Sequence, residues 1–181
     1  MRLRLLVLLP VLSLTACLGG GDDDDDAIGD DIPSNAYCDP VRDWAPDAAQ
    51  FEREVLTLVN EERASGADCG SEGTFPPAPA LTMNGALRCA ARAHSKDMSD
   101  RDFFDHTNPD DELPWDRMEL AGYSWRAAGE NIAWGSPTPA SVMDGWMASD
   151  GHCSNIMSAG FQEIGVGYYA GNYWTQVFGA Q

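Results

Sequence analysis

Five cysteines and three histidines are the side chains of this 181-residue chain with the widest chemical range. Thiols form disulfides, bind metals or act as nucleophiles, and imidazole binds metals or moves protons near neutral pH. Two motifs that would identify an enzyme directly are missing, because the chain has no H-E-x-x-H helix and no G-x-S-x-G turn. The chemistry therefore has to be inferred from where each residue lies.

Cys17 ends a short hydrophobic segment. Two arginines precede the apolar run 5–14. This run is about half of the roughly 20 residues that cross a bilayer, so we expect residues 1–16 to be a cleaved signal peptide, the alternative being an uncleaved anchor. Residues 14–17, Leu-Thr-Ala-Cys, resemble the lipobox of bacterial lipoproteins. The resemblance implies a lipidated Cys17 that anchors the protein, and Leu18 after it favours the outer membrane.

An acidic segment follows the lipobox. Residues 17–35 contain three consecutive glycines, five consecutive aspartates at 22–26 and almost nothing to bury, so we expect a disordered tether. A calcium site is the alternative, but the run lacks the spaced ligands and turn glycine of a calcium loop. Residues 36–181 are then expected to form a single domain.

The charge of the chain limits its partners. The formal net charge is −18, and residues 22–31 contribute seven of the negative charges, so the domain itself is also acidic. Such a surface repels phosphate backbones and sulfated glycans. We therefore expect a monomer that binds no nucleic acid.

Four cysteines remain after Cys17. Their even number in an exported chain favours two disulfides over free thiols or a zinc site, and no C-x-x-C spacing is present. Three pairings are possible, and the spacing does not choose between them. The four are Cys38, Cys69, Cys89 and Cys153.

Apolar residues at helical spacing predict three helices. The first is capped by Asp47 and ends at Gly66. The second covers 85–100 and turns His94 inward, where a hydrogen-bonded core histidine is expected rather than a ligand. The third begins at Thr138, a capping residue followed by proline in the first turn.

Two segments near the C-terminus alternate and are rich in aromatic and β-branched residues. Segments 163–169 and 173–178 are separated by Ala-Gly-Asn, which predicts an antiparallel hairpin. Helices around a small antiparallel sheet make an α+β layered domain.

Five segments, in order, resemble bacterial members of the CAP superfamily (cysteine-rich secretory protein, antigen 5 and pathogenesis-related), also called SCP-like. The resemblance covers about residues 48–179 and implies a three-layer α-β-α sandwich with a small antiparallel sheet. It also implies that Cys69 pairs with Cys153 and Cys38 with Cys89. The segments are 58–63 (LVNEER), 103–107 (FFDHT), 129–133 (GENIA), 146–152 (WMASDGH), and 163–167 with 173–176 (EIGVG, YWTQ).

The resemblance further implies a central cleft with two histidines and two glutamates. By motif position His106, Glu130 and His152 correspond to three of them. Ser149 stands where the second glutamate lies, and Glu163 is the candidate replacement, the alternative being an exposed strand-end carboxylate. For either histidine alone, core packing or a solvated turn is the alternative. Two imidazoles and a carboxylate suit zinc or another divalent cation.

Two function classes remain. As a binding module, the preferred interpretation, the domain captures a small hydrophobic or envelope ligand through the cleft and flanking aromatics such as Trp134 and Tyr168, as lipid- and sterol-binding relatives do. As a hydrolase, it uses a metal held by the cleft residues to activate water, or Ser149 with a histidine. In either case we expect an exported protein, anchored by lipid to the bacterial outer membrane or the cell surface.

Overall fold

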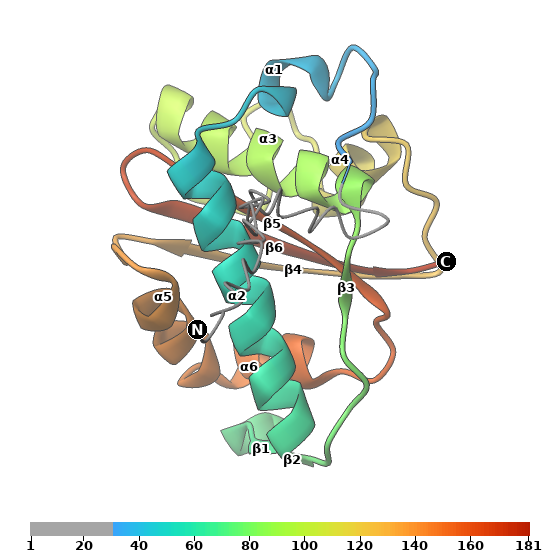
Figure 1. Cartoon of the computed structure of the whole chain (residues 1–181), viewed down its shortest axis with the longest axis vertical. Coiled ribbons are helices and arrows are strands. Elements are labelled where there is room, and N and C mark those ends of the chain that lie inside the picture. The colour runs from blue at the N-terminus through green and yellow to red at the C-terminus, as the bar shows by residue number, and fades with distance from the viewer. Residues whose placement is uncertain (1–30) are drawn as a thin grey trace, which may run out of the picture.

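The computed structural model describes residues 31–181, and it is a layered α+β domain (Figure 1). The predicted signal peptide 1–16, Cys17 and nearly all of the tether lie outside the described residues. Within 31–181 no helix is long and apolar enough to cross a membrane. The elements are α1 (Asp39–Arg42), α2 (Pro46–Ser65), β1 (Ala67–Asp68), η1 (Gly70–Glu72), β2 (Thr74–Phe75), β3 (Thr82–Met83), α3 (Gly85–Arg101), α4 (Pro114–Leu120), β4 (Ala127–Trp134), α5 (Pro139–Met147), α6 (Asp150–Met157), β5 (Glu163–Tyr169) and β6 (Tyr173–Ala180).

The three predicted helices are present as α2, α3 and α5. The cap of α2 was predicted wrongly, because Ala45 is the N-cap and Asp47 lies inside the first turn, behind a proline that starts the helix. Asn84 caps α3 by accepting hydrogen bonds from two backbone amides. Thr138 caps α5 as predicted, and its hydroxyl accepts from the Ser141 amide.

The main sheet has four strands in the order β3-β5-β6-β4. The predicted hairpin is confirmed as β5 and β6, and Tyr169 faces Tyr173 at its turn. β4 pairs antiparallel with β6 along its whole length, whereas the short β3 runs parallel to β5. β4 was not predicted as a strand, because Glu130 and Asn131 interrupt its apolar pattern in the middle.

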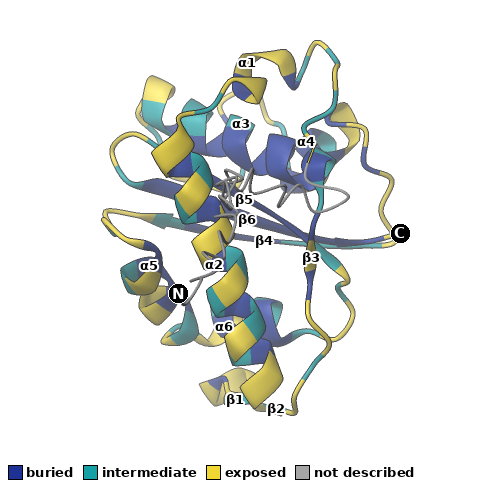
Figure 2. Ribbon diagram, in the orientation of Figure 1, coloured by how far each residue is buried: buried dark blue, intermediate teal, exposed yellow. Residues whose placement is uncertain are grey.

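Helices cover both faces of this sheet. Figure 1 shows α3 and α4 on one side of the strands, α5 and α6 on the other, and α2 crossing in front of the strands. The core between α2, α5, α6 and the sheet contains Trp146 and Trp174, and the core under α3 contains Leu87 and Val177. The buried residues accordingly concentrate in the strands and on α3 (Figure 2). The three-layer sandwich is therefore confirmed.

Glycine sets the distance between α3 and the sheet. Gly165 of β5 lies so close to α3 that a Cβ there would overlap the backbone of Leu87 and Arg88. The absence of a side chain lets the helix rest directly on the strand. α3 in turn places the start of the loop that carries His106.

Two disulfides connect distant segments. One joins Cys38 to Cys89, which ties the start of α1 to α3. The other joins Cys69 to Cys153, which ties the chain just before η1 to α6. These are the pairings implied by the resemblance.

Candidate functional site

Glu130 is the centre of a hydrogen-bond network at the edge strand β4. Its side chain is only 2% exposed. His106 Nδ1–H donates to Oε1 at 2.8 Å, and Arg117 Nη2–H donates to Oε2 at 2.8 Å. Both oxygens of this buried carboxylate are thus engaged from two sides.

The protonation of this network follows from its contacts. Burial alone would raise the pKa of Glu130, but the hydrogen bond from His106 and the charge of Arg117 outweigh it, and the pKa lies below its ordinary value. The same hydrogen bond raises the pKa of His106 above 6.5 against the effect of partial burial. Glu130 is therefore a carboxylate, and His106 is held with its Nδ1 protonated.

Arg117 positions the loop that carries His106. Besides Glu130, its guanidinium donates to the backbone carbonyl of His106 at 2.9 Å and to that of Glu112 at 2.9 Å. Asn108, between them, accepts hydrogen bonds through its side-chain oxygen from the amides of Asp110 and Glu112. The segment 106–112 is thus fixed at both ends by one buried arginine of α4.

His152 approaches from the other side of the sheet. It lies in the first turn of α6, and its backbone carbonyl accepts a hydrogen bond from Asn131 Nδ2 at 3.1 Å. Asn131 is fully buried, and its Oδ1 accepts a hydrogen bond from the side-chain Nδ2 of Asn155 at 2.9 Å. Burial first, and then the charge of His106, lower the pKa of His152. The His152 imidazole is therefore biased toward its neutral form.

This geometry gives Glu130 a different role from the one expected. Both of its oxygens accept hydrogen bonds, and the bond to Oε1 orients His106, as carboxylates do behind metal-binding histidines. Its hydrogen bond leaves His106 Nε2 as the available ligand atom. Within residues 31–181, no group of three or more His, Cys, Asp or Glu is placed to hold a metal ion. The donor set that suits a cation here is the imidazole pair of His106 and His152.

Glu163 does not reach the cleft. Its carboxylate accepts hydrogen bonds from Asn84 Nδ2 at 2.8 Å and from the Tyr123 hydroxyl at 2.6 Å. In the sheet register Glu163 is opposite Gly179, two strands away from β4, beside the edge strand β3. The proposed replacement for the fourth cleft residue was therefore wrong, since Glu163 caps the start of the hairpin.

The two predicted flanking aromatics have different positions. Trp134 is 62% exposed, lies on the same face of β4 as Glu130, and packs against Phe104 and Tyr173 with ring centroids 6.4 and 5.6 Å away. Tyr168 instead packs against Phe51 of α2 in the core on the opposite face. Of the two, only Trp134 lies on the face of β4 that carries Glu130.

His94 is the core histidine that the helix pattern predicted. It is fully buried, and Nε2–H donates to the Asp105 carbonyl at 3.0 Å. Burial lowers its pKa to about 4, so the ring is neutral, and its 3.9 Å approach to Glu130 Oε1 is not an ion pair at neutral pH.

Sequence reasoning missed two residues of this site, Arg117 and Asn131. Both stand next to recognised positions: Asn131 follows Glu130 in the quoted segment GENIA, and Arg117 lies between the FFDHT and GENIA segments. A buried polar residue inside a strand is the signal that could have identified Asn131.

Comparison with known proteins assigns this architecture. Residues 56–179 match the family model described as CAP, cysteine-rich secretory protein family. The chain belongs to the CAP family. The matched region of this CAP domain contains His106, Glu130 and His152.

Several bacterial relatives resemble this CAP domain. The uncharacterized protein YkwD of Bacillus subtilis strain 168 is 42% identical over 129 residues, 71% of this chain and 46% of that protein. The uncharacterized membrane protein YlbC of the same strain is 27% identical, over 75% of this chain and 36% of that protein. The chain thus spans less than half the length of these curated relatives.

Two solved structures share the fold. A Bacillus anthracis extracellular protein containing a SCP domain superposes with a TM-score of 0.67 at 27% identity, over 77% of this chain and 45% of that one. An outer surface protein of Borrelia burgdorferi superposes with a TM-score of 0.61 at 16% identity, over 71% of this chain and 91% of that one. At that identity the second shows the fold alone, whereas the first, which is described as extracellular, fits an exported protein.

Proposed function

We propose that this protein is an exported CAP-domain binding module whose cleft captures its ligand through His106 and His152, with a divalent cation such as zinc held between them. The observation that carries the proposal is the chain of hydrogen bonds from Arg117 through Glu130 to His106, opposite His152. A buried arginine and a buried carboxylate are costly to desolvate. Their use to orient one partly exposed imidazole is typical of a binding centre.

The residues present suit a cation of the zinc type. His106 presents Nε2 with Nδ1 held by a carboxylate, an arrangement that fixes the ring and raises its basicity. His152 adds a second imidazole from α6. A bound cation would supply a Lewis acid with open positions for a ligand atom or water. Trp134 and Phe104, both exposed beside the cleft, would add apolar contact to a ligand.

Hydrolysis is the alternative function. It could use either a serine or cysteine nucleophile or a metal-activated water, and the structure supports these two mechanisms to different degrees. Within residues 31–181, no serine or cysteine side chain is hydrogen-bonded to His106 or His152, and Ser149 makes no side-chain bond at the cap of α6. A nucleophilic triad is thus not assembled. A metal-activated water is the form of hydrolysis that these residues could support.

The proposal includes the membrane anchor. Acylation of Cys17 would hold the domain to a membrane through the acidic tether, with the cleft exposed to the surroundings. The arginine nearest to the cleft histidines, Arg117, is already paired with Glu130. Such a cleft suits a small hydrophobic or envelope ligand rather than a polyanion.

Native mass spectrometry of the purified protein tests this function. A bound divalent cation and a co-purified small ligand, both lost in His106→Ala and retained in Glu163→Gln, would support the binding module. Glu163→Gln is the matched control, because Glu163 lies outside the cleft. Turnover of a peptide or ester that disappears with the cation would favour the hydrolase.

A further inference from the structure

A pocket of about 450 Å³ lies where the start of α2 meets the end of β5. This volume is in the range of small-molecule sites, which is roughly 300–1,000 Å³. The pocket is lined by aromatic rings, two carboxylates, one lysine and small apolar residues, and neither cleft histidine is among them. It is therefore a separate site from the one proposed above.

Three aromatic rings form the apolar part of this pocket. Trp44 and Tyr169 lie with their ring centroids 5.4 Å apart, and Tyr168, which was predicted to flank the cleft, lines the same pocket. All three are only partly buried, so they offer surface to a ligand. The faces of such rings attract cations within about 6 Å. The Lys96 ammonium group, 5.4 Å from the centroid of the Tyr169 ring, already makes a contact of this kind.

Two carboxylates line the same pocket without a cationic partner. Asp43 and Asp47 are exposed, and in the described part of the chain neither forms an ion pair. Arg42, the sequence neighbour of Asp43, is paired with Asp39 instead. Burial first, and then the charge of Asp47, raise the pKa of Tyr168, so this carboxylate acts on the aromatic part of the pocket.

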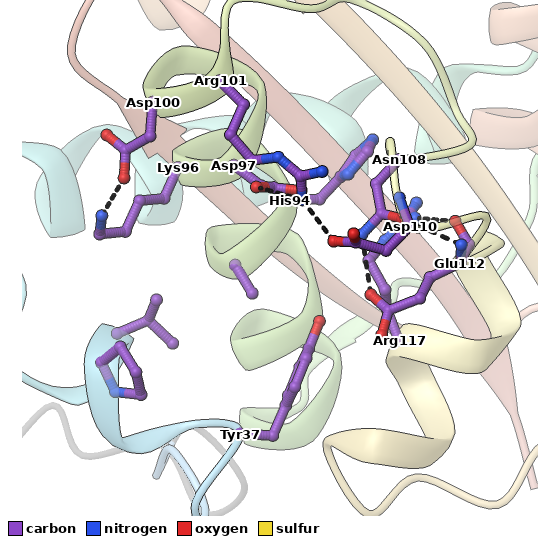
Figure 3. Close-up of a pocket in the computed structure, with 13 residues that line it drawn as sticks. Tyr37, His94, Lys96, Asp97, Asp100, Arg101, Asn108, Asp110, Glu112 and Arg117 are labelled. Carbon is purple, nitrogen blue, oxygen red and sulfur yellow. Dashed lines mark hydrogen bonds and ion pairs between the residues drawn. The ribbon is translucent and has the colours of Figure 1, made fainter.

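The lysine that lines the pocket does not neutralise these carboxylates. Lys96 is paired with Asp100, as Figure 3 shows in a neighbouring pocket that Lys96 also lines. In that neighbouring pocket Arg101 likewise pairs with Asp97 and Asp110, so these charges are balanced within the chain. The aromatic pocket instead presents two unpaired negative charges, which a positively charged ligand would complement.

We propose that this pocket binds an organic ammonium ion with an apolar body, the ammonium group beside Asp43 and Asp47 and the body against Trp44 and Tyr169. The carboxylates attract the charge, and the rings add apolar surface and a cation–π contribution. A hydroxyl group in place of the ammonium lacks the attraction to the carboxylates, and a carboxylate is repelled by them. A free amine and a lysine side chain of a peptide both present the required group.

NMR titration of the purified protein with three ligands of nearly the same shape tests the sign of the charge. They are phenethylammonium, phenethyl alcohol and phenylacetate. We expect phenethylammonium to shift the amide signals of Asp43 and Tyr169 and the indole signal of Trp44. The alcohol should bind at least about tenfold more weakly, and phenylacetate should not bind. Equal binding of the alcohol and the ammonium ion, or shifts confined to other parts of the protein, would overturn the proposal.

Butylammonium and a blocked Gly-Lys-Gly tripeptide distinguish the two sources of the ammonium group, because butylammonium is the lysine side chain without its backbone. Binding of the tripeptide at least about tenfold tighter than butylammonium would indicate a lysine side chain of a peptide. A smaller gain, or a loss, would indicate a free amine.

Replacing both carboxylates, Asp43→Asn with Asp47→Asn, removes the two charges and keeps the side-chain volumes. Because one exposed ion pair changes affinity by about two- to fivefold, the double variant should lose most of the preference for the ammonium ion over the alcohol. Its binding of the alcohol should be unchanged, which verifies that the pocket is intact.

The matched control is Glu61→Gln with Glu72→Gln. These two exposed carboxylates lie near the end of α2 and in η1, so the control removes the same number of charges outside the pocket and should keep the preference. Retention of the full preference in the double asparagine variant would overturn the proposal.

Discussion

Glu130 and Asn131 are consecutive residues of β4, and their side chains hold the two cleft histidines from opposite faces of the sheet. This follows from strand geometry, because successive side chains of a strand alternate between faces. His106 comes from the loop on the α3 side, and His152 comes from α6 on the other. One dipeptide in an edge strand thus brings together two segments 46 positions apart in the sequence.

Glu130→Gln should lower the pKa of His106 to 6.5 or below, because the charged hydrogen-bond acceptor that favours the imidazolium is lost. Histidine NMR titration measures this directly. The variant should also lose about 3–5 kcal/mol of folding free energy, because Arg117 stays buried without its carboxylate. Glu163→Gln is the control, and its His106 should titrate as in wild type. An unchanged His106 pKa in Glu130→Gln would refute the role of Glu130.

His106 should stabilise the folded state more at low pH than at high pH. Because its folded pKa is raised, its contribution is fully present below pH 6.5 and is lost as the pH rises through the folded pKa. The pH dependence of unfolding above pH 6.5 should therefore be weaker in Glu130→Gln than in wild type.

Asn131→Leu should disturb His152 without releasing His106. Removing the amide leaves the His152 carbonyl and Asn155 without their buried partner, which should cost about 1–3 kcal/mol. Histidine NMR should show changed signals for His152 and a His106 pKa that is still raised. If both histidines respond equally, the two faces of β4 are not independent.

His94 should make the domain acid-sensitive. Burial lowers its pKa to about 4, so its contribution to stability is present above pH 6.5 and is lost progressively as the pH falls toward 4. The loss should be on the order of 3 kcal/mol. Urea unfolding at several pH values, compared between wild type and His94→Gln, separates this effect from carboxylate titration. Parallel pH profiles in the two proteins would contradict it.

Each disulfide should stabilise the domain by about 4 kcal/mol through loop closure. The loops span 51 and 84 residues. Replacing Cys69 and Cys153 together by alanine should lower the melting temperature about as much as replacing Cys38 and Cys89. Peptide mapping of the oxidised protein should recover only these two pairs, and a Cys38 to Cys69 peptide would contradict the structure.

Local sequence patterns predicted those helices and strands whose formation depends on residues close together in the sequence. The helices of α2, α3 and α5 and the β5-β6 hairpin follow from periodicity and turn residues, and His94 follows from its helix face. β4 could not be predicted in this way, because its buried centre is polar. Its hydrogen-bond partners, such as Arg117 and Asn155, are distant in sequence.

The site was predicted in part, and only through motif resemblance. His106 and Glu130 are hydrogen-bonded at β4, and the backbone carbonyl of His152 is bound by Asn131 of the same strand, but no spacing rule distinguishes a carboxylate that binds a metal from one that orients a histidine. That difference depends on Arg117, which occupies the second oxygen of Glu130. The prediction for Glu163 failed because its position at the start of β5 places its carboxylate beside Asn84 and Tyr123, which are distant in sequence.

Calorimetric titration of zinc into wild type, His106→Ala, His152→Ala and Glu163→Gln tests most directly whether the two cleft histidines form one binding centre. We expect wild type and Glu163→Gln to bind alike, and each alanine variant to bind at least about tenfold more weakly, since loss of either imidazole removes a ligand. When the pH is lowered, the zinc affinity of wild type should begin to decrease while the pH is still above 6.5. The reason is that Glu130 raises the pKa of His106, so protons compete with the cation at a higher pH than for an ordinary histidine. Equal zinc binding by wild type and both alanine variants would contradict the proposed cleft.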